Sequence, residues 1–249
     1  MVLAPFAARK LHAQGVTTKR SREKLGHATQ PRPQAGPLVW LHAASVGESL
    51  SVLALITRMG QMLPTAQFLI TSGTATSAKL VAQRLPPRTI HQFAPLDAPR
   101  PVKRFLKHWH PDAAIFVESE LWPQMLRRTH ATGARMALVN ARMSEKTVSF
   151  WADWPRAARY IFDVFALILT QNDAMARNML RMHAPEDRVA RGVNLKSLAG
   201  PLPVDANALP EVRETLADRP TWVASSTHDG EERAVLSAHR TLLKRFPDL

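Results

Sequence analysis

The sequence predicts an α/β protein whose core is a doubly wound, parallel β-sheet. Short apolar runs recur along the chain, and such continuous runs are typical of strands that are buried on both faces of a sheet. Longer stretches with helical character separate them, and an alternation of strand and helix favours parallel pairing. The expected strands are 38–42, 67–71, 113–117, 135–139 and 166–170, with weaker candidates at 89–93 and 188–192.

The stretches between these runs are expected to be helices that cover the sheet. One of them, 98–109, carries Phe105 and Trp109 among lysines. These rings are expected either to pack in the core or to lie at a membrane interface. The expected helices are 48–62, 74–84, 98–109, 121–131, 144–163 and 173–182.

Two regions flank the regular pattern, and they set the expected domain boundaries. Residues 1–37 form a basic N-terminal segment, with a short helix and a proline-rich linker. Residues 38–200 form the main domain, and Gly200-Pro201-Leu202-Pro203 then breaks the pattern. The tail, 201–249, is expected to hold the linker and one βα unit. Its expected elements are a helix at 210–217, a strand at 222–224 and a helix at 231–245.

One βα unit cannot bury its own apolar faces. The tail is therefore expected either to pack on the first domain or to open a second one.

At the other end, the apolar residues 1–8 are too few for a signal h-region or a spanning helix, so no complete targeting segment is expected.

Composition limits the classes of function. The chain has 249 residues, 45% of them apolar, and it has no cysteine, which excludes disulfides and thiolate metal sites. The ten histidines show no metal-ligand spacing, and no metal is expected. The net charge of +13 attracts polyanions such as nucleic acid, anionic lipid or phosphorylated glycolipid. Nucleic-acid binding ranks last because no recognition motif is present.

Two acidic motifs follow apolar runs, at 45–48 (Ser-Val-Gly-Glu) and 118–123 (Glu-Ser-Glu-Leu-Trp-Pro). In an open α/β sheet, ligands bind at the carboxyl ends of the strands. Glu48 is a candidate general base for a sugar hydroxyl, with a glycine before it that permits a tight turn. The alternative is a charge at a helix start, capped by Ser45.

The second motif offers a partly buried carboxylate, Glu118, at the end of strand 113–117. It is expected to act in a reaction or to form a structural pair with a cation such as Arg142. Glu120 is expected to cap the next helix, while Trp122 and Pro123 are expected to pack in its first turn.

Other polar residues follow strands or lie in loops. Thr71-Ser72-Gly73-Thr74 is expected to hold a phosphate or sugar oxygen, or simply to cap a helix. Residues 225–228 repeat that pattern in the tail. Arg142, which follows Asn140, is expected to meet a phosphate of the substrate or to neutralise Glu118. Lys196 is either an ordinary surface lysine or a cation for charge that develops during a reaction.

Several short motifs follow one another in order over about two hundred residues, and each alone is weakly specific. They lie at 42–48, 71–77, 118–123, 139–144, 171–172, 194–196 and 224–232. On these motifs, the chain resembles the 3-deoxy-D-manno-octulosonic acid (Kdo) transferases of Gram-negative lipopolysaccharide assembly.

The resemblance implies a two-domain glycosyltransferase of the GT-B kind, with a Rossmann-like N-terminal half. That half takes a lipid A precursor, and the C-terminal domain holds the donor CMP-Kdo. The implied transfer inverts the anomeric centre and needs neither metal nor cofactor. The tail, 201–249, is then the start of a truncated donor domain, so we expect little or no activity from this chain alone. The implied location is peripheral, on the anionic cytoplasmic face of the bacterial inner membrane.

The resemblance also assigns roles to single residues. Glu48 is the base, and Glu118 stabilises the transition state directly or by positioning Lys196. The candidate acceptor-side residues are Ser45, Gly47, Thr71, Ser72, Gly73, Thr74, Asn140 and Arg142. The donor-side residues are Ser226, Thr227, His228 and Glu231.

Two points stay open. The family usually continues after the lysine with an aromatic residue and an aspartate, whereas this chain has Ser197-Leu198. The alternative function is a non-catalytic basic module that binds anionic lipid or a separate donor-domain partner.

Overall fold

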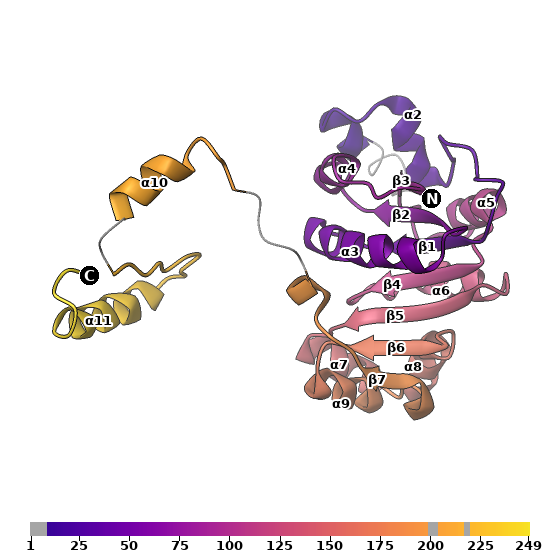
Figure 1. Cartoon of the computed structure of the whole chain (residues 1–249). Coiled ribbons are helices and arrows are strands. Elements are labelled where there is room, and N and C mark those ends of the chain that lie inside the picture. Colours follow the sequence, from indigo (N-terminus) through magenta and orange to yellow (C-terminus); the bar gives the residue numbers. More distant parts are fainter. Residues whose placement is uncertain (1–8, 199–203, 217–219) are drawn as a thin grey trace. The chain divides into compact units, whose positions relative to one another are not determined.

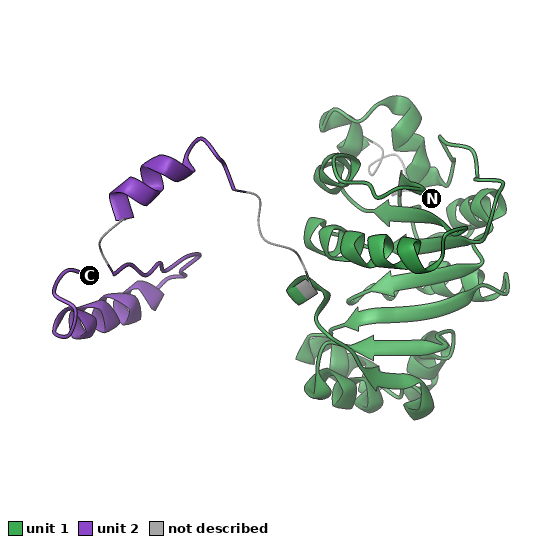
Figure 2. Cartoon of the chain, in the orientation of Figure 1, with its two compact units in different colours: residues 1–199 green, residues 200–249 purple. Residues whose placement is uncertain are grey.

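The computed structural model describes residues 9–198, 204–216 and 220–249. The chain divides into two compact units, residues 1–199 and 200–249, which Figure 2 shows in different colours. The first unit holds the sheet, and the second holds two described helices. No helix in the described ranges is both long enough and apolar enough to cross a membrane.

Seven strands form one parallel sheet in the first unit. They are β1 (Leu38–His42), β2 (Gln67–Ser72), β3 (Thr89–Phe93), β4 (Ala113–Val117), β5 (Arg135–Ala141), β6 (Leu167–Thr170) and β7 (Val189–Arg191). Their order is β3-β2-β1-β4-β5-β6-β7 (Figure 1). The chain winds outward from β1 to β3 and then returns to the other side of β1 for β4. The predicted doubly wound sheet is confirmed, including both weaker strands.

Helices cover both faces of this sheet. The helices of the first unit whose bounds are described are α2 (Thr18–Ser21), α3 (Val46–Met62), α4 (Ala75–Ala82), α5 (Pro99–Trp109), α6 (Pro123–His130), α7 (Glu145–Ala152), α8 (Pro155–Phe162) and α9 (Asp173–Arg181). Short 3₁₀ segments are η1 (Arg22–Leu25), η2 (Glu186–Arg188) and η3 (Leu195–Leu198). Successive strand residues point to opposite faces. Trp40 therefore packs in one core cluster with residues of α5 and α6, while Leu41 packs in the other with residues of α3.

The helix expected over 144–163 is two helices, α7 and α8. The break falls at Trp154, whose backbone is not helical and which precedes Pro155 at the first turn of α8. A residue before proline is disfavoured in the α conformation, so the expected single helix was wrong for a reason visible in the sequence.

The aromatic residues of α5 belong to the core. Phe105 and Trp109 are fully buried, and the Trp109 indole donates to Gln92 Oε1 at 2.9 Å. The core-packing alternative is confirmed, and these two rings do not form a membrane interface. The lysines of this helix lie on its outer face, where Lys103 and Lys107 are exposed.

The segment before β1 packs against the edge strand β3. Glu23 of η1 is fully buried; its carboxylate accepts from the Phe93 backbone N–H at 2.7 Å, from the Thr29 hydroxyl, and from the Arg20 guanidinium at 3.3 Å. The same guanidinium lies 2.8 Å from Nδ1 of His91, whose Nε2 lies 2.9 Å from the Ser72 hydroxyl. An acidic side chain thus anchors this basic segment to the sheet.

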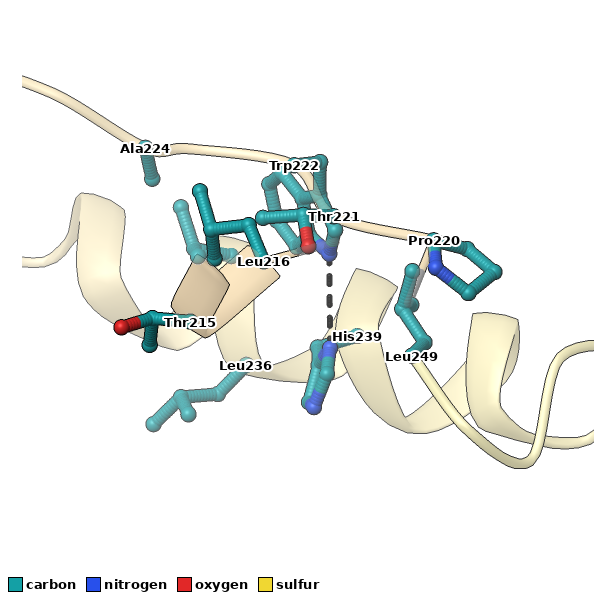
Figure 3. A pocket seen from close by; sticks show the side chains of 10 residues that line it. Thr215, Leu216, Pro220, Thr221, Trp222, Ala224, Leu236, His239 and Leu249 are labelled. Carbon is teal, nitrogen blue, oxygen red and sulfur yellow. Dashed lines mark hydrogen bonds between the residues drawn. The ribbon is translucent and has the colours of Figure 1, made fainter. Parts of the chain in front are cut away.

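The second unit contains α10 (Leu209–Leu216) and α11 (Glu231–Leu243), close to the two helices expected in the tail. The strand expected at 222–224 is wrong, because these residues are irregular. The described part of this unit offers them no neighbouring strand, and an isolated strand leaves its backbone groups unpaired. A cavity of about 420 Å³ lies here, where the Trp222 indole donates to Nδ1 of His239 at 3.4 Å (Figure 3).

Candidate active site

The site lies where the strand order reverses, between β1 and β4. Beyond β1 the chain enters α3 on one face of the sheet, and beyond β4 it leads to α6 on the other face (Figure 1). Loops that leave a sheet in opposite directions open a crevice at this edge. The first acidic motif begins at Ser45, three residues beyond the end of β1, and the second begins at Glu118, directly after β4.

Glu48 occupies the first turn of α3. Its Oε2 accepts from the Ala44 backbone N–H at 2.9 Å, and its Oε1 accepts from the Ser45 hydroxyl at 2.7 Å. Ser45 Oγ in turn accepts from the Glu48 backbone N–H at 3.2 Å, so Ser45 caps the start of α3. The carboxylate is half-buried and forms no ion pair within the described ranges. Each oxygen keeps a second lone pair, so the capping role leaves room for a substrate hydroxyl.

Glu118 lies in the left-handed region, with φ of +57°, directly after β4. This conformation is costly for a residue other than glycine. It accompanies two contacts of Oε1, which lies 3.0 Å from Lys196 Nζ and accepts from the Asn140 side-chain amide at 3.2 Å. The Glu118 side chain is 13% exposed and that of Lys196 is 47% exposed. The carboxylate of the pair is therefore largely buried, while the ammonium group is open to the crevice.

Asn140 connects Glu118 to the loop that carries Lys196. It is buried, has φ of +55°, and its Oδ1 accepts from the Leu195 backbone N–H at 3.1 Å. The register between β5 and β6 shifts around this residue. A cavity of about 430 Å³ with mostly apolar walls, including Leu55, adjoins Asn140 and Leu195.

The two acidic motifs meet at Lys196. A β-carbon built on Gly47 would lie 3.9 Å from Lys196 Cε, which is an ordinary contact distance. Gly47 is helical in α3 and keeps a negative φ, so its backbone does not demand a glycine. The turn that carries Glu48 therefore lies beside the Lys196–Glu118 pair, and the structure brings together the three residues expected to be catalytic.

The hydroxyl-rich segment at the end of β2 and in the turn that follows contributes less to the crevice. Thr71 is fully buried, where its Oγ1 accepts from the Trp40 indole at 2.8 Å, and the Ser72 hydroxyl contacts His91. Thr74 accepts from the Ser77 backbone N–H at 3.1 Å, so it caps α4. Gly73 donates to the Ala44 carbonyl at 2.9 Å and so supports the turn that holds Glu48.

Arg142 is exposed and forms no ion pair with another described residue. Glu118 pairs with Lys196 instead of Arg142, so the structural pairing considered from the sequence is wrong. The guanidinium is left available to a ligand at the end of β5.

Sequence reasoning missed a buried pair behind the crevice. Nε2 of His42 lies 3.3 Å from Glu120 Oε2 without an aligned hydrogen bond, and the Trp122 indole N–H donates to the same oxygen. Burial alone raises the pKa of the Glu120 carboxyl, but these neighbours outweigh it and hold the pKa below its usual value. Glu120 does not cap α6, because Asp97 accepts from that helix's first free N–H groups. The sequence did contain a signal for this pair, because His42 is a titratable residue at the end of the apolar run 38–42.

The candidate donor-side residues all belong to the second unit. Glu231 Oε2 accepts from the His228 backbone N–H at 2.8 Å, and Ser226 has φ of +55°. Ser226, Thr227, His228 and Glu231 are exposed at the start of α11. Their donor role stays a prediction. In the described part of the chain, no three His, Asp or Glu side chains gather as a metal site would require.

Comparison with known proteins supports the same fold and family. The family described as "3-Deoxy-D-manno-octulosonic-acid transferase (kdotransferase)" matches residues 19–199. A relative in Rickettsia felis, named 3-deoxy-D-manno-octulosonic acid transferase, is 35% identical over 86% of this chain and 46% of its own length. One in Arabidopsis thaliana, named as a probable mitochondrial enzyme of that kind, is 32% identical over 91% of this chain and 52% of its own. The chain thus spans about half the length of these relatives.

Solved structures share the fold at low identity. The UDP-GlcNAc 2-epimerase of Neisseria meningitidis, bound to UDP-GlcNAc, has a TM-score of 0.54 at 13% identity, covering 85% of this chain and 63% of its own. A putative enzyme of the same name from Listeria monocytogenes has a TM-score of 0.53 at 12% identity, covering 86% and 61%. These likenesses show a Rossmann-like α/β fold.

Proposed function

This chain belongs to the 3-deoxy-D-manno-octulosonic acid transferase family, and we propose that it forms the acceptor-binding half of an enzyme that transfers Kdo to a lipid A precursor. Residues 38–200 hold the acceptor, and residues 201–249 begin the part that holds CMP-Kdo. The support is that three charged side chains, Glu48, Glu118 and Lys196, lie close together where the strand order of the sheet reverses. Each belongs to one of the motifs on which the chain resembles the family.

Glu48 acts as the general base in this proposal. Its carboxylate takes the proton of an acceptor hydroxyl as that oxygen attacks the anomeric carbon of Kdo. The bond from that carbon to the CMP phosphate breaks on the opposite side, so the centre inverts and CMP leaves with the electron pair. The observation that carries the proposal is the position of Glu48, which is half-buried and not paired with Lys196 or another described cation.

Lys196 supplies positive charge where negative charge builds up, on the carboxylate of Kdo or on the leaving phosphate. Glu118 positions it through the 3.0 Å contact, and Asn140 bonds to Glu118 and, at Leu195, to the loop that carries Lys196. Arg142, exposed at the end of β5, is proposed to meet a phosphate of the acceptor. A planar guanidinium suits that contact because it donates two parallel hydrogen bonds.

The test is a Glu48→Gln substitution in the full-length gene product, with CMP release measured from CMP-Kdo and lipid IVA. The amide cannot accept the proton, so we expect kcat to fall by about a hundredfold or more. The thermal midpoint should stay close to that of the unsubstituted protein, since the amide oxygen still accepts a capping bond. Glu186→Gln, at an exposed glutamate of η2, is the matched control. Near-normal turnover by the Glu48 variant contradicts the proposal.

A second function, binding to an anionic membrane surface, is favoured by the net charge of +13. Basic residues near an anionic surface each contribute about 1 kcal/mol of attraction. In this proposal the protein is peripheral on the cytoplasmic face of the inner membrane. Flotation with vesicles that contain anionic lipid should carry the chain upward, and neutral vesicles should not. Equal flotation with both kinds of vesicle, or with neither, contradicts it.

A further inference from the structure

A tryptophan stands exposed at the carboxyl edge of the sheet with its ring held in place. Trp122 directly precedes α6, the residue is 43% exposed, and its indole N–H donates to Glu120. The helix does not depend on this tryptophan for a cap. Asp97 accepts from the Met125 backbone N–H at 2.6 Å and from that of Gln124 at 3.2 Å. Another explanation for the fixed indole is therefore required.

The group that fixes the indole is a buried carboxylate. Glu120 is 9% exposed and lies 3.3 Å from His42, which is itself buried. Nδ1 of His42 lies 3.0 Å from the Thr71 hydroxyl, which accepts from the Trp40 indole. Burial of an ionised side chain is costly, and a well-packed apolar pair would stabilise the fold at least as well. The pair is thus poorly explained by stability, whereas it does orient the indole.

The loop that carries Trp122 is the loop that carries Glu118. Glu118 is anchored to Lys196 and Asn140, and Glu120 is anchored to His42 at the end of β1. Between these anchors the Leu121 backbone N–H donates to the Ser119 carbonyl at 2.8 Å. The exposed indole is therefore tied, within one short and doubly anchored loop, to the candidate catalytic pair.

We propose that the Trp122 indole is a platform on which a hexopyranose ring of the acceptor stacks. One face of such a ring presents C–H groups, which pack on a flat aromatic surface, while its hydroxyls stay at the rim and remain solvated. Glu120 and His42 are positioning residues that set the plane of the indole. This inference rests on the proposed function and names the part of the acceptor that this edge of the sheet recognises.

Trp154 provides a matched control within the same unit. Like Trp122 it directly precedes a proline at the first turn of a helix, and the residue is 60% exposed. Its indole N–H has no hydrogen-bond partner among the described residues. A general contribution of exposed tryptophan to lipid binding should affect both residues, whereas sugar stacking should affect Trp122 alone.

The experiment measures equilibrium binding of lipid IVA, in detergent micelles, to the 249-residue chain. Phosphatidic acid, which has phosphate and acyl chains but no sugar ring, is the comparison ligand. Trp122→Ala should weaken lipid IVA binding by about fivefold to tenfold, the size expected for one stacking contact. Trp122→Phe should weaken it less, because a phenyl ring retains part of the stacking surface. Trp154→Ala should leave binding unchanged, and none of the variants should alter phosphatidic acid binding.

Positioning is tested separately with Glu120→Gln. The amide oxygen still accepts from the indole, so this variant should bind more tightly than Trp122→Ala.

In the full-length gene product, Trp122→Ala should raise the KM for the acceptor while kcat changes by less than about twofold. A fall in kcat at constant KM would overturn the inference, since it would indicate disturbance of Glu118.

Three further results are decisive. Normal lipid IVA binding by folded Trp122→Ala would overturn the inference and leave the proposed function intact. An equal loss in Trp122→Ala and Trp154→Ala, or an equal loss with phosphatidic acid, would also overturn it. No lipid IVA binding by the unsubstituted chain would contradict the proposed function, and this inference would fail with it.

Discussion

Oε1 of Glu118 lies 3.0 Å from Nζ of Lys196, although the two residues follow different strands of the sheet. The contact depends on two residues in the left-handed region, Glu118 and Asn140, with φ of +57° and +55°. Lys196, for which an ordinary surface position was one of the two expectations, is thereby held at the crevice, beside the turn that carries Glu48.

Loss of the lysine charge should affect activity far more than stability. Lys196→Met removes the cation but keeps a side chain of similar length, and kcat of the full-length protein should fall by about a hundredfold or more. The pair is partly exposed, so the free energy of unfolding should change by less than about 1 kcal/mol. Lys196→Arg should retain part of the activity. Turnover assays and chemical denaturation measure both effects, and an active Lys196→Met variant would exclude an electrostatic role.

Asn140 should be important for both stability and geometry. Asn140→Ala removes two hydrogen bonds from a buried site, and alanine tolerates the left-handed backbone at this position, with φ of +55°, less well than asparagine does. We expect a loss of about 3 kcal/mol in the free energy of unfolding, of which about 1 kcal/mol comes from backbone strain. Asn140→Gly avoids the strain, so it should be the less destabilised of the two. Urea denaturation of both variants separates the two contributions, and equal losses would show that strain contributes little.

Glu23 should be a strong determinant of stability despite its place in a basic segment. Glu23→Ala leaves the Phe93 N–H and the Thr29 hydroxyl without their buried acceptor. The free energy of unfolding should fall by about 3 kcal/mol, as expected when one member of a buried charged network is removed. Asp187→Ala, at an exposed carboxylate, should change it by less than about 0.5 kcal/mol. A Glu23 variant as stable as this control would show that the segment is not anchored through its carboxylate.

His91 should make the protein sensitive to acid. Burial, together with the positive charges of Arg20 and Lys24, lowers the pKa of His91 to about 3. In the unfolded chain the ring titrates near its ordinary value of about 6.5. Between these values the unfolded state holds one more proton, so stability falls as the pH falls, by about 1.4 kcal/mol per pH unit. This contribution is fully present above pH 6.5.

The measurement compares the unsubstituted protein with His91→Gln by denaturation at pH 7, 5 and 4. The glutamine side chain does not titrate, so its stability should depend less steeply on pH within this window. Identical slopes for both proteins would indicate that the imidazole is not held neutral.

The fold and the position of the site follow from local patterns. The apolar runs at 38–42 and 113–117 became β1 and β4, and parallel strands end at the same edge, so Glu48 and Glu118 were expected to be near each other. The break before Pro155 could also be predicted from the sequence, although a single helix over 144–163 was expected. Each of these features depends on residues that are close together in the chain.

The side-chain partners did not follow from local patterns. Arg142 was as plausible a partner for Glu118 as Lys196, because the choice depends on the left-handed backbone at two strand ends. The pair of Glu120 with His42, and the burial of Glu23, likewise depend on which strands are neighbours and in what register. Contacts of this kind join distant segments, and no local spacing encodes them.

The anchoring of Glu23 also affects the tendency of this protein to self-associate. β3 is the outermost strand on its side of the sheet, and the Phe93 N–H is already bonded to Glu23 at 2.7 Å. An open strand of this kind is a template on which a strand of another molecule can add. A shortened protein that starts at Leu38 would expose that template, and we expect it to aggregate as its concentration rises. We therefore expect the early basic segment to limit self-association at this edge of the sheet, a task separate from any contact with a substrate.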